Sequence, residues 1–225
     1  MIKTLEAWLI HKQWSGDSSV RLTLFTREQG LIQGLFKGGR SPKKQAFLNL
    51  FTPLWVTLET RYQRIFIKNI EGVSPILPLQ GHALFSAFYI NEIVFYSLPQ
   101  NQPEMNLYGR YVDTLHLLGN TREIKEIEPL LRLFEWHLLG VCGYHFSWTQ
   151  EAITQEAIIA EQFYRFVPET GFIAAHSGFS GHSILAFAQN DWGNLAALKT
   201  AKNVFRLAID HLLEGRTIKA RSLYQ

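Results

Sequence analysis

The sequence predicts an α+β protein in which a five-stranded OB-fold β-barrel is followed by an all-helical C-terminal domain. Residues 1–80 contain short segments of alternating apolar and polar residues separated by turn residues, which is typical of strands. This alternation ends near Pro78, and apolar residues then recur at helical spacing. We therefore expect an OB-fold domain at residues 1–80 and a helical domain at residues 81–225.

Five segments of the first domain are predicted strands: residues 4–13, 19–26, 30–37, 54–60 and 64–73. Alternation is clearest in two of them, whose apolar residues should face the barrel interior: Val20, Leu22, Leu24, Leu54, Val56 and Leu58. The long connection after the third segment matches the rhythm of an OB-fold, a barrel that binds oligonucleotides. A small SH3-like barrel is the structural alternative.

The second domain contains several helical patterns. Residues 83–98 are apolar nearly all round and predict a buried helix, and a second helix is expected at 103–118. A third should begin near Pro129, whose missing N–H is harmless in a first turn. A last helix starts at about residue 196 and ends at Gly215, a residue suited to a left-handed conformation. Residues 143–180 between them are irregular and rich in aromatic residues, Gly and His.

Composition limits the class of protein. With 225 residues, of which 47% are hydrophobic, the chain can bury a core. The single cysteine, Cys142, excludes an internal disulfide and fits a reducing compartment. The most apolar stretch is too short to span a membrane, and charged residues interrupt the first segment before it resembles a signal peptide. We expect a cytoplasmic protein, associated with the nucleoid and not with a membrane.

Charge is distributed unevenly between the two domains. Residues 1–80 contain 11 Lys and Arg against 5 Asp and Glu, whereas the rest of the chain contains 11 against 14. This asymmetry predicts that the first domain meets a polyanion, with nucleic acid as the leading candidate. The alternative is that the charges are simply spread unevenly over solvated faces.

Basic and aromatic residues alternate along the predicted barrel. Single-strand binders need cations that follow the phosphates and flat rings that stack on bases. The candidate DNA-binding residues are Arg21, Lys37, Arg40, Lys43, Lys44, Arg61, Tyr62 and Arg64. The densest cluster follows the third strand, where Gly38 and Gly39 allow the backbone to approach a phosphate, although the spacing is not that of a Walker loop. Rings such as Phe25 and Phe36 have a competing interpretation as core residues.

Metal binding and catalysis have little support in the sequence. The candidate zinc ligands are Cys142, His145, His176 and His182. Their spacing is irregular, and a free cysteine at the end of an apolar helix is usually buried as a small hydrophobe. No catalytic signature is present. We therefore expect no cofactor, no metal and no enzymatic activity.

Six short motifs follow one another along nearly the whole chain. In the barrel domain they are Gly16-Asp17-Ser18-Ser19, Thr26-Arg27-Glu28-Gln29-Gly30 and Lys37-Gly38-Gly39-Arg40. In the helical domain they are Tyr89-Ile90-Asn91-Glu92, Phe134-Glu135-Trp136-His137-Leu138-Leu139 and Gly143-Tyr144. In sequence and order these motifs resemble those of the RecO family, and they predict the same succession of barrel and helices as the periodicity does.

The resemblance implies a role in bacterial recombinational repair. A RecO-like protein is expected to bind single- and double-stranded DNA, to anneal complementary strands, and to help RecA replace single-stranded DNA-binding protein on gaps. RecR is the expected direct partner. We also expect the helical domain to bind the acidic, hydrophobic-ended tail of single-stranded DNA-binding protein, with Lys125 and Arg132 as candidate cations beside an apolar pocket. Alternatives are an OB-fold RNA-binding or nuclease-accessory protein, or a structural adaptor.

The sequence departs from the family in one region. Many members of the family that this chain resembles carry a four-cysteine zinc module. The second pair of cysteines in that module follows a segment similar to Phe166-Val167-Pro168-Glu169-Thr170-Gly171. Here the second pair would fall at about Ala175 and Gly178, and Cys142 lies upstream of the first. The resemblance therefore implies that residues at about 144–180 form a degenerate, metal-free module.

Overall fold

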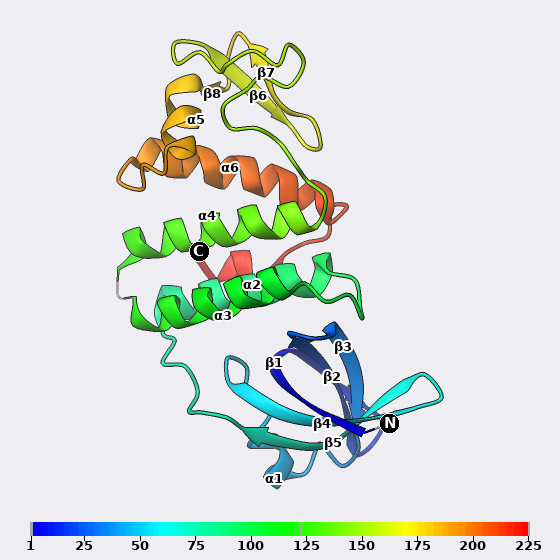
Figure 1. Ribbon diagram of the computed structural model, residues 1–225. Helices are drawn as coiled ribbons and strands as arrows, with labels where there is room; N and C mark the ends of the chain where they lie inside the picture. Colours follow the sequence, from blue (N-terminus) through cyan, green and yellow to red (C-terminus); the bar gives the residue numbers. More distant parts are fainter. Residues whose placement is uncertain (1, 122, 225) are drawn as a thin grey trace. The chain divides into compact units, whose positions relative to one another are not determined.

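The N-terminal strands form a closed barrel in the computed structural model, which describes residues 2–121 and 123–224 (Figure 1). The strands are β1 (Ile2–Ser15), β2 (Ser19–Thr26), β3 (Gly30–Phe36), β4 (Pro53–Arg61) and β5 (Arg64–Gly72), with a short helix α1 (Pro42–Gln45) between β3 and β4. They pair in the order β1-β2-β3-β5-β4, and β1 also pairs with β4. Only the β3–β5 pair among these described strands is parallel. This five-stranded barrel is an OB-fold, which confirms the predicted class.

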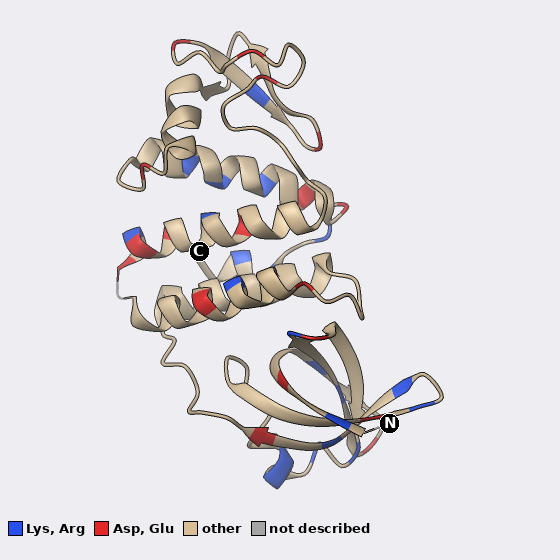
Figure 2. Ribbon diagram, viewed as in Figure 1, with Lys and Arg blue, Asp and Glu red and all other residues tan. Residues whose placement is uncertain are grey.

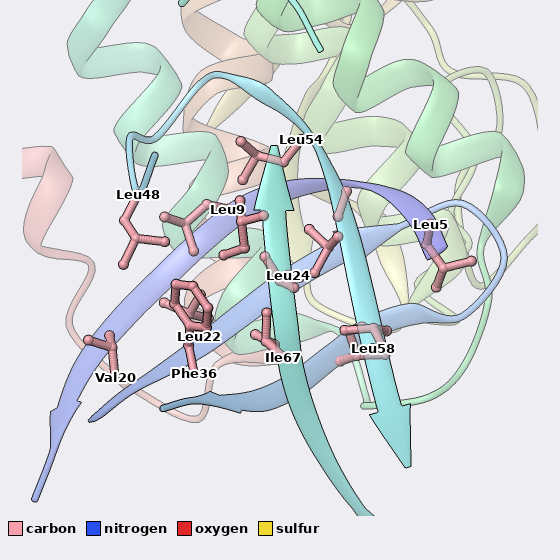
Figure 3. Close-up of a cluster of buried hydrophobic side chains, with 14 residues drawn as sticks. Leu5, Leu9, Val20, Leu22, Leu24, Phe36, Leu48, Leu54, Leu58 and Ile67 are labelled. Carbon is pink, nitrogen blue, oxygen red and sulfur yellow. The ribbon is translucent and has the colours of Figure 1, made fainter. Parts of the chain in front are cut away.

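Aliphatic side chains fill the barrel (Figure 3). The rows predicted from alternation, Val20, Leu22, Leu24 on β2 and Leu54, Val56, Leu58 on β4, all point inward and are at most 4% exposed. Ile32 and Ile67 join them from β3 and β5. Because side chains alternate between the two faces of a strand, the intervening residues are left for the outer surface.

Helices α2 (Gly81–Ser97) and α3 (Met105–Asn120) belong to the same compact unit as the barrel. Phe25 on the outer face of β2 is fully buried, with its ring centroid 5.3 Å from that of Tyr108 on α3. Phe25 is therefore a packing residue and is not available to a DNA base. By contacts this unit comprises residues 2–121 and 218–224, whereas residue 80 marks where strands give way to helices along the chain.

The C-terminal segment returns to α2 as a 3₁₀ helix, η1 (Lys219–Tyr224). The two carboxylate oxygens of Glu92 accept hydrogen bonds from the backbone N–H groups of Lys219 and Ala220, at 2.9 and 2.7 Å. Asn91 accepts one from the Tyr111 hydroxyl at 2.8 Å. Polar residues within the apolar α2 pattern thus fasten α3 and the chain end to this helix.

The second unit, residues 123–217, contains helices and a small sheet. Its elements are α4 (Ile124–Val141), β6 (Phe163–Val167), β7 (Gly171–Ala175), β8 (Phe179–Ser180), α5 (Gly181–Ala188) and α6 (Leu195–Leu212). The sheet has the order β7-β6-β8 and lies within residues 143–180, for which the sequence predicted irregular structure. Such short strands offer too few alternating residues to be detected by periodicity.

Helix α4 begins earlier than the sequence predicted. It starts at Ile124, so Pro129 lies inside the helix instead of in its first turn. Pro129 has no N–H to donate to the carbonyl of Lys125. The residues before Pro129 are nevertheless good helix formers, and buried Ile127 and Leu131 anchor the helix on both sides of the proline. None of the helices in residues 2–121 and 123–224 is long and apolar enough to cross a bilayer.

Candidate nucleic-acid interface

Basic residues line a groove on the outer surface of the barrel, formed by the β3–α1 connection, α1, β4 and β5. Figure 2 marks the Lys and Arg positions of the barrel in blue on the ribbon. We call this groove the cationic groove; it encloses about 280 Å³ and is lined by Lys37, Lys44, Glu59, Arg61, Phe66, Ile67 and Lys68. Four cations face a single carboxylate. The groove therefore carries excess positive charge above an aromatic and aliphatic floor, a combination suited to a nucleic-acid backbone.

The lysines that follow β3 are held in place by specific contacts. Lys44 Nζ donates a hydrogen bond to the Lys37 carbonyl oxygen at 2.7 Å and lies 4.5 Å from the centroid of the Phe36 ring. Lys37 Nζ lies 5.4 Å from the centroid of the Phe66 ring. The cation–π contacts and the hydrogen bond to the carbonyl oxygen restrict the motion of these long side chains. Less conformational entropy is then lost when they bind an anion.

Glu59 organises the other side of the cationic groove. Its carboxylate contacts Arg61 at 2.6 Å and Lys68 at 3.3 Å, and its side chain is 13% exposed. The hydrogen bond from Arg61, together with that from Lys68, holds the pKa of Glu59 below its ordinary value. Glu59 is therefore the carboxylate shared by these two cations within the protein.

A second groove, the amide groove, encloses about 540 Å³ on the outer side of β2, β3 and β5. Its polar lining consists of Ser15 and six longer side chains: Arg21, Gln33, Gln63, Arg64, Gln100 and Asn101. Gln100 and Asn101 come from the connection between α2 and α3 and complete the groove from outside the barrel. Phe66 lines both grooves, so the two are neighbours on one surface.

The remaining predicted residues, Arg40, Lys43 and Tyr62, line neither groove. Tyr62 is 99% exposed at the tip of the β4–β5 hairpin, and its positive φ of 47° is typical of a tight two-residue turn. The Arg40 guanidinium lies 4.8 Å from the centroid of the Trp14 ring, and Lys43 is exposed on α1. The structure thus brings Lys37, Lys44 and Arg61 together in one groove and Arg21 and Arg64 in the other.

Sequence reasoning missed several groove residues. Arg64, Phe66 and Lys68 stand at every second position of β5, and this period of two was a signal that could have identified Phe66 and Lys68. Lys68 is also the extra residue of a β-bulge opposite Thr57 and Leu58, a feature that redirects a side chain. Gln100 and Asn101 gave no such signal because only folding brings their loop to the barrel.

Comparisons with known proteins identify the family. Residues 1–76 match the family model described as Recombination protein O N terminal, and residues 78–221 match Recombination protein O C terminal. The chain belongs to the RecO family of DNA repair proteins. DNA repair protein RecO of Legionella pneumophila (strain Corby) is 52% identical over 223 residues, covering 99% of this chain and 97% of that protein.

More distant RecO relatives also match over nearly their whole length. DNA repair protein RecO of Marinobacter nauticus is 31% identical over 226 residues, covering 97% of this chain and 92% of that protein. The corresponding protein of Actinobacillus pleuropneumoniae serotype 7 is 32% identical over 231 residues, covering 98% and 95%. The resemblance seen in the motifs is therefore confirmed along the whole chain.

The region where many RecO relatives would hold zinc does not fit a metal here. Within residues 2–121 and 123–224, no three side chains of His, Cys, Asp or Glu gather at one point. Gly178, near an expected cysteine position, has φ +136°, and a Cβ there would lie 2.5 Å from the Tyr164 carbonyl oxygen. A cysteine at position 178 would thus require a different backbone.

The two cations predicted to contact a partner's tail differ in exposure. The Lys125 side chain is 71% exposed and contacts Glu123 at 2.8 Å. The Arg132 side chain is 4% exposed and pairs with buried Glu135 at 3.0 Å. Lys125 can meet a ligand directly, whereas Arg132 would first have to exchange Glu135 for the ligand's carboxylate.

Proposed function

We propose that this RecO-family protein binds single- and double-stranded DNA through its barrel, anneals complementary strands and assists RecA loading onto gaps coated by single-stranded DNA-binding protein. The observation that carries the proposal is the cationic groove, which Lys37, Lys44 and Lys68 line together with the ring of Phe66. Annealing requires the neutralisation of phosphate charge and the proximity of two strands, and no bond is made or broken. Accordingly, we assign no catalytic residue.

Salt dependence tests the role of the cationic groove. Changing Lys37, Lys44 and Lys68 together to alanine should weaken binding to all DNA sequences alike and reduce the slope of log affinity against log salt by about two to three. Base preference should not change, because phosphate contacts carry no direct sequence information. A folded triple variant with the slope of the unmodified protein would refute this assignment.

Two matched variants sharpen the experiment. Changing Lys199, Lys202 and Arg206 on α6 to alanine alters the net charge equally but leaves the barrel intact, so the salt slope should stay close to that of the unmodified protein. Glu59→Gln should act in the opposite direction, since it removes the carboxylate that competes with phosphate for Arg61 and Lys68. Tighter DNA binding by Glu59→Gln would show that these cations contact the backbone.

We also propose two protein partners, RecR and the acidic, hydrophobic-ended tail of single-stranded DNA-binding protein. The exposed ammonium group of Lys125 is the first contact that we assign to the tail. A tail peptide should bind the unmodified protein at low salt and bind Lys125→Ala more weakly. Annealing of complementary oligonucleotides should be measured with and without single-stranded DNA-binding protein and RecR; failure to accelerate annealing under all these conditions would refute the mediator role.

A further inference from the structure

The long polar side chains of the amide groove have no hydrogen-bond or ion-pair partners among the described residues. These side chains belong to Arg21, Gln33, Gln63, Arg64, Gln100 and Asn101. By contrast, each cation of the neighbouring cationic groove is already held by a ring, a carbonyl or Glu59. The two grooves are therefore prepared for different ligands.

The chemistry of the amide groove fits nucleic-acid bases better than phosphates. A carboxamide offers one acceptor and two donor hydrogens without net charge, so it adds little to phosphate neutralisation but can pair with the edge of a base. Arg21 and Arg64 add two donor forks that suit guanine. No Asp or Glu is among the described lining residues, so nothing there repels a nucleic acid.

The two grooves lie along one strip of the barrel surface. Strands β3 and β5 run parallel with Leu35 opposite Phe66. Gln33 lies on β3, and Lys37 directly follows the end of this strand. At the rise of an extended strand, the distance from Gln33 to Lys37 is about 13 Å, enough for a few nucleotides. Phe66 lines both grooves and marks the crossing point between them.

The α2–α3 connection is fixed to the barrel at this place. The backbone N–H of Asn101 donates to the carbonyl of Leu31 at 2.8 Å, and Gln100 forms a parallel bridge with Leu31. Gly30 has φ +66°, and a Cβ on it would lie 1.8 Å from the Gln102 carbonyl oxygen. Only glycine at position 30 permits this approach, so the barrel motif that ends in Gly30 also positions Gln100 and Asn101.

We infer that the amide groove holds the bases of a single DNA strand whose phosphates lie in the cationic groove, with Gln33 and Gln100 contacting base edges. This inference rests on the proposed DNA-binding function and adds the α2–α3 connection to the interface. A duplex keeps the pairing edges of its bases engaged. The amide groove therefore favours single strands, whereas the cationic groove accepts the phosphates of either form.

The test compares three ligands across a salt series: a single-stranded oligonucleotide, a strand of equal length that lacks its bases, and a duplex. The full-length protein is compared with Gln33→Ala/Gln100→Ala and with Gln102→Ala, a control in the same loop whose side chain does not line the groove. The double variant should bind the ordinary strand about tenfold more weakly, while its salt slope and its affinity for the base-free strand and the duplex stay unchanged. Gln102→Ala should match the unmodified protein throughout.

Two results would overturn the inference. In the first, the unmodified protein binds the ordinary and base-free strands equally, or the double variant loses affinity equally for all three ligands. Salt-dependent DNA binding would then survive, so the proposed function would stand without the amide groove. In the second, none of the three ligands binds in a salt-dependent manner, and the proposed function fails together with the inference.

Discussion

The barrel and the small sheet of the second unit are both β-structures, yet they fill their interiors with different side chains. In the described barrel core, Phe36 is the single aromatic ring among aliphatic residues. The small sheet instead packs against a cluster of rings: Trp136, Phe146, Trp148, Phe166, Phe172, Phe187 and Phe205. The reason lies in closure. A closed barrel surrounds its own interior, so rows of Leu, Val and Ile suffice.

A sheet made of strands with five, five and two residues cannot enclose a core. Large rings compensate because each buries a large area and pairs edge to face with its neighbours. The ring centroids of Phe166 and Phe172 lie 5.4 Å apart, and the two ring planes meet at 62°. The ring centroid of Trp148 lies 5.2 Å from that of Phe172. We therefore expect aromatic packing to supply much of the stability of this small sheet.

The largest effect should come from the aromatic cluster. Phe172 is fully buried, so Phe172→Ala should lower the free energy of unfolding by about 3–5 kcal/mol. Phe163 in the same sheet is 46% exposed, and Phe163→Ala should cost much less. Urea denaturation followed by tryptophan fluorescence measures both. Equal losses for the two variants would mean that the cluster does not stabilise the sheet.

The barrel core should respond more mildly to a small cavity. Ile32 is fully buried among aliphatic neighbours, and Ile32→Val should lower the free energy of unfolding by about 0.5–1.5 kcal/mol. DNA affinity should stay unchanged, since Ile32 lines neither groove. A change in DNA affinity without a loss of stability would show that barrel packing and the surface are coupled.

A smaller, pH-dependent effect is expected at Glu151 in the second unit. Its carboxylate accepts hydrogen bonds from the backbone N–H groups of Thr154, Ile153 and Ala174, and these hold the pKa of Glu151 below its ordinary value of 4.5. A depressed pKa contributes stability that is present above the unfolded-state value and is lost as pH falls through the folded-state value. At pH 7 the unmodified protein should therefore have a higher urea midpoint than Glu151→Gln. At about pH 3.5 the difference between the two midpoints should be smaller. A constant difference would contradict this assignment.

Treatment with a metal chelator should have no effect on stability. Because the chain has a single cysteine, we expect a chelator to leave its thermal unfolding curve unchanged, and elemental analysis should find no stoichiometric zinc. One tightly held zinc per chain, with loss of structure on its removal, would contradict this expectation. Such a result would return Cys142, His145, His176 and His182 to consideration as ligands.

The candidate site was predictable only in part. The interleaving of basic and aromatic residues pointed to five cations that line the two grooves: Arg21, Lys37, Lys44, Arg61 and Arg64. Their role in DNA binding stays a prediction. Arg132 shows the limit of this reasoning: its position in a helix favoured a surface cation, but the fold pairs it with Glu135 in a buried environment. Charge alone does not report which face of a helix is covered.

By itself, the sequence determined the order of barrel and helices, the inward rows of β2 and β4, and the basic character of the first domain. These are local properties, since the period of two and the charge of a segment are set by neighbouring residues. Only the tertiary structure decided that Glu59 sits between two cations, that Gln100 and Asn101 reach the barrel, and that residues 163–180 form a sheet. The first and third depend on how short strands pair and the second on contacts between residues about 70 positions apart, namely Leu31 with Gln100 and Asn101. Local patterns of charge and hydrophobicity do not specify these pairings.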